Sequence, residues 1–245
     1  MSGESCPYPA WEPPISVRLT VLPEHRCTYQ PEKVAQSRAF WAERMPASVY
    51  HALMDAGFRR SGKLVYQPIC RGCRDCLPIR VLVEQFKPSK SQRRCARRNA
   101  DLQVTCGPLE QTDEKWELYQ RYIAGWHGGD ADDRPGFESF LYDSPVDTVE
   151  FTYRDSTGRL LAVGICDLYT QSLSSVYFYF DPADADRCLG TFGALYELQF
   201  SRDQKIPYYY LGYWINKCQS MRYKAMYRLH EILHPDNIWR LGEAE

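Results

Sequence analysis

The feature that most constrains how this chain can fold is a segment, residues 58–99, in which positive charge and cysteine are concentrated. Between positions 59 and 98 there are twelve lysine or arginine residues and only two acidic residues, a net charge of +10. The whole chain of 245 residues has 30 basic and 31 acidic residues, so the remainder carries −11. This division of charge indicates that one face of the folded protein meets a polyanionic partner.

The composition predicts a folded protein with a real core, because 44% of the residues are hydrophobic. The first fourteen residues lack the basic and apolar regions of a secretory signal. The longest apolar runs, such as residues 160–166, are far shorter than the ~20 residues that a membrane span needs. We therefore expect a cytoplasmic protein with no membrane partner, in which cysteines stay reduced.

The cysteines of the basic segment have metal-ligand spacing. Cys70, Cys73 and Cys76 are separated by two residues each, and Cys27 is a candidate fourth ligand. Thiolate ligands suit zinc or an iron–sulfur cluster, and three ligands at this spacing resemble a ferredoxin pattern. The alternative is a set of reduced, partly buried thiols. No organic cofactor is expected.

Two strands and two helices are predicted in and before the basic segment. A helix is expected at 47–56, where Gly57 would end it, and strands are expected at 64–67 and 79–86. A helix at 91–100 would begin after a capping serine, Ser89 or Ser91.

The arginines of this last helix share one face. Arg93 and Arg97, like Arg94 and Arg98, are four positions apart, and no acidic residue offsets them. Phosphate contact is the favoured interpretation, and a solvated basic face is the alternative. The predicted tRNA-binding set adds two lysines: Lys87, Lys90, Arg93, Arg94, Arg97 and Arg98.

The second half has a different pattern, and we divide the chain into a Cys-rich, basic region, 1–143, and a catalytic domain, 144–245. Helices at 112–126 and 136–142 precede the division. Strands, a helix and a further strand follow: 148–154, 160–168, 174–180, 190–202 and 208–215. This order predicts an α+β domain with a mixed, acetyltransferase-like (GNAT-type) sheet and flanking helices, formed by the second half alone.

Several short motifs occur in an order that resembles one known family. They are Gly57-Phe58-Arg59-Arg60-Ser61-Gly62, Tyr66-Gln67-Pro68 with the three cysteines and Pro78, Ser89-Lys90-Ser91-Gln92-Arg93-Arg94, Val176-Tyr177-Phe178-Tyr179-Phe180-Asp181-Pro182, Leu189-Gly190-Thr191, Tyr210-Leu211-Gly212-Tyr213-Trp214-Ile215 and Met221-x-Tyr223-Lys224-Ala225. The chain thus resembles the arginyl-tRNA–protein transferase superfamily, and within it the bacterial aspartate/glutamate leucyltransferases. It departs from the family pattern at Gln67, usually arginine, and at Leu229, usually proline.

The resemblance implies a fold, a reaction and partners. The implied fold is acetyltransferase-like, with aminoacyl-tRNA in place of acyl-coenzyme A. The implied reaction moves leucine, or arginine in eukaryotic relatives, from tRNA to the α-amine of a protein with N-terminal Asp or Glu. The product then enters an N-degron pathway. Eukaryotic relatives also bind an iron–sulfur cluster through cysteines of the N-terminal half.

Aminolysis of an ester needs a neutral amine, donors for the oxyanion and a proton for the leaving oxygen. Asp181 is a candidate to hold or deprotonate the amine, and Tyr213 and Tyr223 are candidate donors. Lys224 joins this catalytic set. For each of these residues, the alternative is a structural role.

The acidic side chain of the acceptor needs a cation, because a guanidinium binds a carboxylate in bidentate fashion. The candidates are Arg59, Arg60, Arg80 and Arg222, with Lys224 as a further choice. Phosphate binding or a plain surface charge are the alternatives.

Two other functions compete with the transferase. The first is an ordinary acyl-coenzyme A N-acetyltransferase, for which residues 187–193 provide only a degenerate pyrophosphate-binding turn. The second is a non-enzymatic, metal-stapled nucleic-acid-binding module. The acidic, aromatic second half argues against that module, because a pure binder would not need it.

Overall fold

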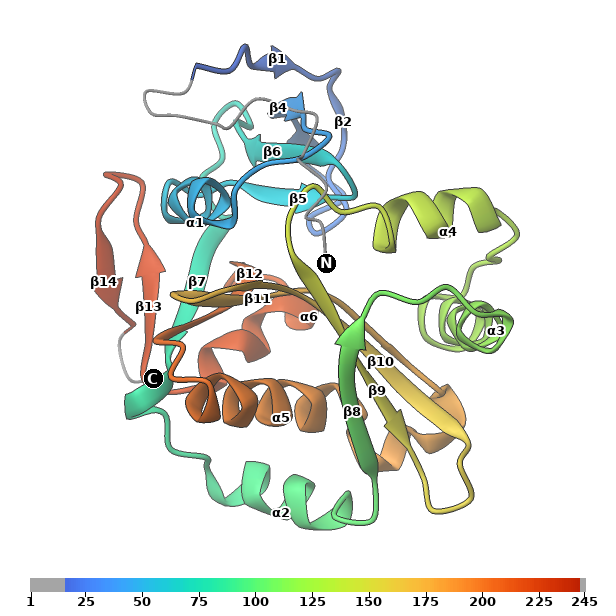
Figure 1. Ribbon diagram of the computed structural model, residues 1–245. Helices are drawn as coiled ribbons and strands as arrows, with labels where there is room; N and C mark the ends of the chain where they lie inside the picture. Colours follow the sequence, from blue (N-terminus) through green and yellow to red (C-terminus); the bar gives the residue numbers. More distant parts are fainter. Residues whose placement is uncertain (1–15, 243–245) are drawn as a thin grey trace, which may run out of the picture.

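The computed structural model describes residues 16–242, and its architecture is organised on one large mixed sheet (Figure 1). The sheet has eight strands in the order β14-β13-β7-β12-β11-β10-β9-β8. Their bounds are Leu77–Leu82 (β7), Gln103–Pro108 (β8), Thr148–Arg154 (β9), Leu160–Tyr169 (β10), Ser172–Phe180 (β11), Tyr208–Trp214 (β12), His230–Leu233 (β13) and Trp239–Leu241 (β14). The predicted α+β class with a large mixed sheet and flanking helices is confirmed.

The centre of the sheet follows the predicted order of strand, turn, helix and strand. β9, β10 and β11 are antiparallel neighbours, α5 (Leu189–Asp203) follows, and β12 returns parallel to β11. Asp181 directly follows β11, and β12 lies beside that strand, as expected. β11 and β12 pair only near their starts, between residues 172–174 and 208–210, so their carboxyl ends are not paired with each other.

The expectation that the second half forms this sheet alone is wrong. β7 lies between β12 and β13, and β8 forms one edge beside β9. β7 is almost wholly apolar on its buried side, where Ile79 and Val81 have no exposed surface, so it belongs in the interior of a sheet. The division of the chain into a Cys-rich, basic region, 1–143, and a catalytic domain, 144–245, stays a prediction.

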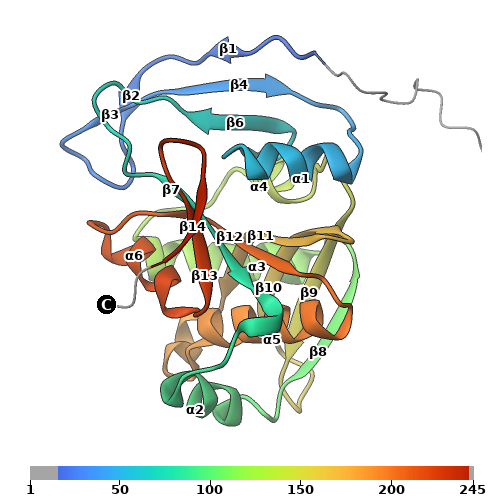
Figure 2. The same cartoon turned by 90° about the vertical axis from the view of Figure 1, so that its left-hand side faces the viewer.

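A smaller sheet lies above the large one, with α1 (Ala47–Asp55) beneath it (Figures 1 and 2). Its strand order is β1-β4-β6-β5, with bounds Thr20–Val21, Ser37–Trp41, Leu64–Pro68 and Arg59–Ser61, and a separate hairpin pairs β2 (His25–Arg26) with β3 (Val34–Ala35). Apolar side chains of α1, β4 and β6 pack on Tyr210 of β12. This shared core fixes Arg59 and Arg60 of β5 against the large sheet.

Helices cover the large sheet on its other side and at one end. α5 packs on β11, and α2 (Lys90–Arg98) packs outside α5 (Figure 1). Ser89 caps α2 in a reciprocal capping box with Gln92, as its sequence predicts. α4 spans Arg134–Leu141, and two short turns, α6 (Gln219–Arg222) and η4 (Tyr223–Met226), follow β12.

The helix expected at 112–126 changes type near its end. α3 spans Asp113–Tyr122, and a π-helical turn, η2 (Ile123–His127), continues it. Gly128, with a positive φ of 69°, ends this turn. Across residues 16–242, no helix is long and apolar enough to cross a membrane.

Candidate active site

The candidate active site centres on a bend in β12 at Gly212. The pairing of β12 with β7 shifts register between Tyr210 and Tyr213, and Gly212 has a positive φ of 79°. Glycine suits this left-handed conformation because it has no Cβ. Arg59 Nη2 donates to the Gly212 carbonyl at 3.3 Å. Lys224 Nζ donates to the Tyr213 carbonyl at 2.9 Å, so the bend brings the two cationic side chains to one place.

Lys224 has the properties of a general base. Burial, and to a lesser degree the positive charge of Arg59, lower its pKa from 10.5 to about 7. No carboxylate of the described chain forms an ion pair with its Nζ. A lysine of this pKa is unprotonated in about half of the molecules at pH 7, so it can accept a proton from an amine.

Arg59 is a buried cation without a counter-anion. Its side chain is 5% exposed, and Nη1 donates to the carbonyls of Met54 and Phe58 at 3.3 and 2.6 Å. Its Nε is buried and has no hydrogen-bond partner. The guanidinium lies over the rings of Tyr210 and Tyr213, and no carboxylate within residues 16–242 pairs with it. An unpaired buried charge is costly, so this arrangement suits a carboxylate from another molecule.

Arg60 and Arg80 are already paired. Arg60 makes a bidentate ion pair with Asp167, at 2.8 and 2.6 Å. Arg80 binds Asp55 at 2.7 Å and Glu231 at 2.8 Å. Both arginines are buried and structural in this arrangement, and their predicted contact with the acceptor would require them to exchange partners.

The other candidates near the bend differ in exposure. Tyr213 is buried and donates its hydroxyl to the Gly57 carbonyl at 2.9 Å, so as placed it supports the fold. Burial raises the pKa of Tyr213 well above 10. Tyr223 is 45% exposed beside Lys224, and Arg222 is exposed without an ion pair to any described residue. Tyr223 is therefore the tyrosine better placed to reach a substrate.

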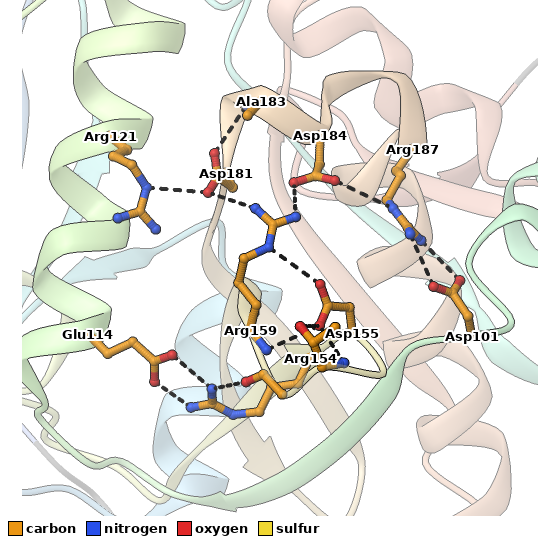
Figure 3. A network of polar contacts seen from close by, with 12 residues as sticks. Asp101, Glu114, Arg121, Arg154, Asp155, Arg159, Asp181, Ala183, Asp184 and Arg187 are labelled. Atoms are coloured by element: carbon orange, nitrogen blue, oxygen red, sulfur yellow. Dashed lines mark hydrogen bonds and ion pairs between the residues drawn. The ribbon is translucent and has the colours of Figure 1, made fainter.

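Asp181 lies in an ion-pair network at the end of β11 (Figure 3). Its carboxylate accepts from Arg121 Nε at 3.3 Å, lies 3.5 Å from Arg159 Nη1, and accepts from the Ala183 amide at 3.1 Å. The network continues from Arg159 to Asp184 at 2.7 Å. These contacts join α3, the β9–β10 turn and the turn after β11. As placed, Asp181 is a structural carboxylate, and its predicted contact with the amine stays a prediction.

The basic helix α2 presents its cations to solvent. All six predicted tRNA-binding side chains are exposed, and none forms an ion pair with a carboxylate of the described chain. Arg93 donates to the Pro88 carbonyl and Arg98 to the Asp186 carbonyl, so two of them are braced against the backbone. On its inner side, Gln92 donates to the Met226 carbonyl of η4 at 3.4 Å. The charged face is thus tied to the turn that carries Lys224.

The four candidate metal ligands lie near one another. Burial, and then the proximity of Cys70, Cys27 and Cys73, raise the pKa of Cys76 to about 12. Cys70, Cys73 and Cys76 line an open hollow of about 120 Å³ that Tyr213 also borders. However, in the part of the chain that the structure describes, no group of three or more His, Cys, Asp or Glu is placed to hold a metal ion. Metal binding by the four cysteines stays a prediction, and no step of the reaction is assigned to a metal.

Two side chains near the site were missed by the sequence interpretation. Glu197 of α5 is buried, and burial raises the pKa of its carboxyl to about 7. Its Oε2 accepts a hydrogen bond from the Tyr209 hydroxyl, while the buried Oε1 has no hydrogen-bond partner. The sequence signal for Glu197 was an acidic residue on the apolar side of a predicted helix. Trp126 is exposed on the π-helical turn, and the Gly-rich sequence after it was the only signal.

Comparison with known proteins assigns the family. Residues 25–94 match the family described as "Arginine-tRNA-protein transferase, N terminus", and residues 114–234 match the corresponding C terminus. The aspartate/glutamate leucyltransferase of Thiobacillus denitrificans is 38% identical over 95% of this chain and 98% of its own length. That of Hahella chejuensis is 38% identical over 88% of this chain and 93% of its own length.

The chain belongs to the arginine-tRNA-protein transferase family, so it is a transferase and the predicted resemblance is confirmed. Likeness to solved structures is looser. The crystal structure of FemX covers 82% of this chain and 80% of that chain, with 10% identity and a TM-score of 0.45.

Proposed function

We propose that this protein transfers leucine from leucyl-tRNA to the α-amine of proteins whose N-terminal residue is Asp or Glu. The similarity to aspartate/glutamate leucyltransferases supports leucine as the donor group and Asp or Glu as the acceptor. The family assignment supports aminoacyl-tRNA as the donor molecule. Arginine is the competing donor group, and an N-degron pathway in the cytoplasm is the expected destination of the product.

The observation that carries the mechanism is Lys224, a lysine whose pKa lies near 7, beside the unpaired Arg59. Arg59 would bind the carboxylate of the acceptor's first side chain. The α-ammonium, with an ordinary pKa of about 8, would give its proton to Lys224. The neutral amine would then attack the ester carbonyl to form a tetrahedral oxyanion.

The second half of the reaction breaks the ester. As the tetrahedral intermediate collapses, the bond to the ribose oxygen breaks and Lys224 gives its proton to that oxygen. The neutral Lys224 then takes the second proton from the attacking nitrogen and releases it to solvent. The product amide forms, and deacylated tRNA leaves. Tyr223, exposed beside Lys224, is the candidate donor to the oxyanion or to the leaving oxygen.

We also propose that the large sheet is acetyltransferase-like. The support is the strand order, in which α5 connects the parallel strands β11 and β12, which pair only near their starts. In this proposal the aminoacyl end of the tRNA lies between the carboxyl ends of β11 and β12, which are not paired with each other, and the α2 cations contact the tRNA phosphates. Zinc or an iron–sulfur cluster on the four cysteines stays a prediction, which anaerobic purification followed by metal analysis would test.

A transfer assay tests the proposed function. Purified protein is incubated with tRNA charged with labelled leucine or arginine and with peptides that begin with Asp, Glu, Asn, Gln or Ala. We expect label from leucyl-tRNA on the Asp and Glu peptides alone. Label transferred from arginyl-tRNA instead would change the donor. Transfer of an acetyl group from acetyl-coenzyme A, with none from charged tRNA, would replace the proposal by the acyl-coenzyme A alternative.

A further inference from the structure

An exposed tryptophan, Trp126, lies beside the carboxyl end of β11. Trp126 belongs to the π-helical turn Ile123–His127 and is 55% exposed. Single π-helical turns are uncommon and occur often at functional sites. The aminoacyl-transfer chemistry proposed above does not use this side chain.

The turn is built to hold the indole in place. Gly125 packs so closely on Pro182 that a Cβ added to it would lie 2.8 Å from the proline Cγ. The indole packs on the Phe180 ring with a centroid distance of 5.1 Å and an interplanar angle of 68°. Trp126 is therefore fixed beside the carboxyl end of β11, while more than half of its surface stays open.

Further aromatic contacts connect this tryptophan to Lys224 and the basic helix. Tyr122 also packs on Phe180, with a ring centroid distance of 5.1 Å. Burial, and then the nearby Tyr223, raise the pKa of Tyr122 to about 12. Tyr223 and Met226 of η4 are both exposed. Because Gln92 of α2 donates to the Met226 carbonyl, α2 is joined to η4, the turn that also carries Tyr223.

We propose that Trp126 stacks on the terminal adenine of the tRNA donor. Proteins that bind single-stranded nucleic acid combine cations that follow the phosphates with aromatic rings that stack on the bases. Here the cations of α2, which form no ion pair with a carboxylate among residues 16–242, supply the first part, and Trp126 supplies an exposed ring. The occupant is the unpaired 3′ end of a tRNA, and the inference rests on the proposed function.

A thermodynamic cycle tests the stacking contact. Affinity is measured for wild type and Trp126→Ala, each with deacylated tRNA that has or lacks its terminal adenosine and with intact tRNA charged with leucine. We expect each single change to weaken binding roughly five- to hundredfold, and the double change to weaken it no further. Additive losses would overturn the proposal. A loss in the variant that is confined to charged tRNA would assign the indole to the leucyl side chain instead.

Direct spectroscopy and a matched control separate stacking from general damage. With 2-aminopurine at the terminal position, the wild type should quench its fluorescence, Trp126→Phe should quench it partly, and Trp126→Ala should not. Trp41, 58% exposed on β4 of the small sheet, is the control, and Trp41→Ala should leave affinity and quenching unchanged. Equal quenching by wild type and Trp126→Ala would contradict stacking. If the wild type binds no tRNA at all, the proposed function itself fails.

Discussion

The pKa of Lys224 couples activity to stability at a single side chain. Its folded pKa of about 7 lies below the ordinary value of 10.5, so between these values the unfolded chain binds more protons than the folded chain. Stability therefore rises with pH through this window, and the partly buried lysine destabilises the protein at pH 7. Functional residues often carry such a cost.

Replacing Lys224 with methionine should separate the two effects. We expect the transfer rate to fall by about 10²- to 10⁴-fold because the general base is lost. The melting temperature at pH 7 should rise, and its difference from wild type should shrink as the pH approaches 10.5. Single-turnover rates and thermal unfolding across pH measure both. A variant with the wild-type rate would remove Lys224 from the mechanism.

Glu197 should show the opposite pH dependence. Burial raises its pKa to about 7, so the folded chain binds more protons than the unfolded chain between the ordinary value of 4.5 and 7. The contribution of this carboxyl to stability is present below pH 4.5 and is lost as the pH rises to 7. Glu197→Gln, which keeps an acceptor for Tyr209, should be more stable than wild type at pH 8 and gain least at pH 4.5. Denaturant titrations at the two pH values decide this, and an equal gain at both would contradict the assigned ionisation.

Among the elements, α2 gives the clearest electrostatic prediction. Arg93, Arg94 and Arg97 have no carboxylate partner in the described chain, so their replacement by Gln removes charge without breaking an ion pair. We expect weaker tRNA binding, with the log–log salt slope reduced by close to one for each lost phosphate contact. Arg154, which pairs with Glu114, is the control, and Arg154→Gln should leave the slope unchanged. An unchanged slope in the α2 variant would mean that this face is merely solvated.

Local signals predicted most of the elements. The Ser89 cap and the Gly57 stop each act within a few residues, and α2 and α1 begin and end near the predicted positions. The strand expected at 148–154 is β9. β8 and β13 were missed because each joins the rest of the sheet through a strand distant in sequence, β9 for β8 and β7 for β13. The π-helical turn was missed because the helical periodicity continues through it.

The site was predicted less completely than the elements. Arg59 and Arg60 are adjacent and chemically identical, and only the tertiary structure gives Arg60 a carboxylate and leaves Arg59 without one. Lys224 was named from a motif, but its lowered pKa depends on burial and on Arg59, which is far away in the sequence. Pairing and desolvation are tertiary properties, so sequence reasoning could nominate these residues and not rank them.

For the whole molecule, the shared sheet predicts that the two halves do not fold independently. β7 lies between β12 and β13, so a fragment of residues 144–245 would lose the strand that joins them. We expect this fragment to be unfolded by circular dichroism and by proton NMR. Adding residues 77–108, which contain β7 and β8, should improve its order. A cooperatively unfolding fragment would contradict the dependence on β7.

The proposed role of Arg59 as the acceptor-binding cation beside Lys224 is tested most directly by comparing two peptides, one with N-terminal Asp and one with N-terminal Asn. The ratio of their kcat/KM values is measured for wild type and for Arg59→Met. The wild type should favour Asp by about 2–5 kcal/mol, a factor of roughly 30 to several thousand, because Asn leaves the buried guanidinium unpaired. Arg59→Met should lower transfer to Asp peptides to the Asn level while tRNA affinity stays unchanged. An Asp preference that survives in Arg59→Met, with the variant folded, would contradict the assignment of this acceptor site.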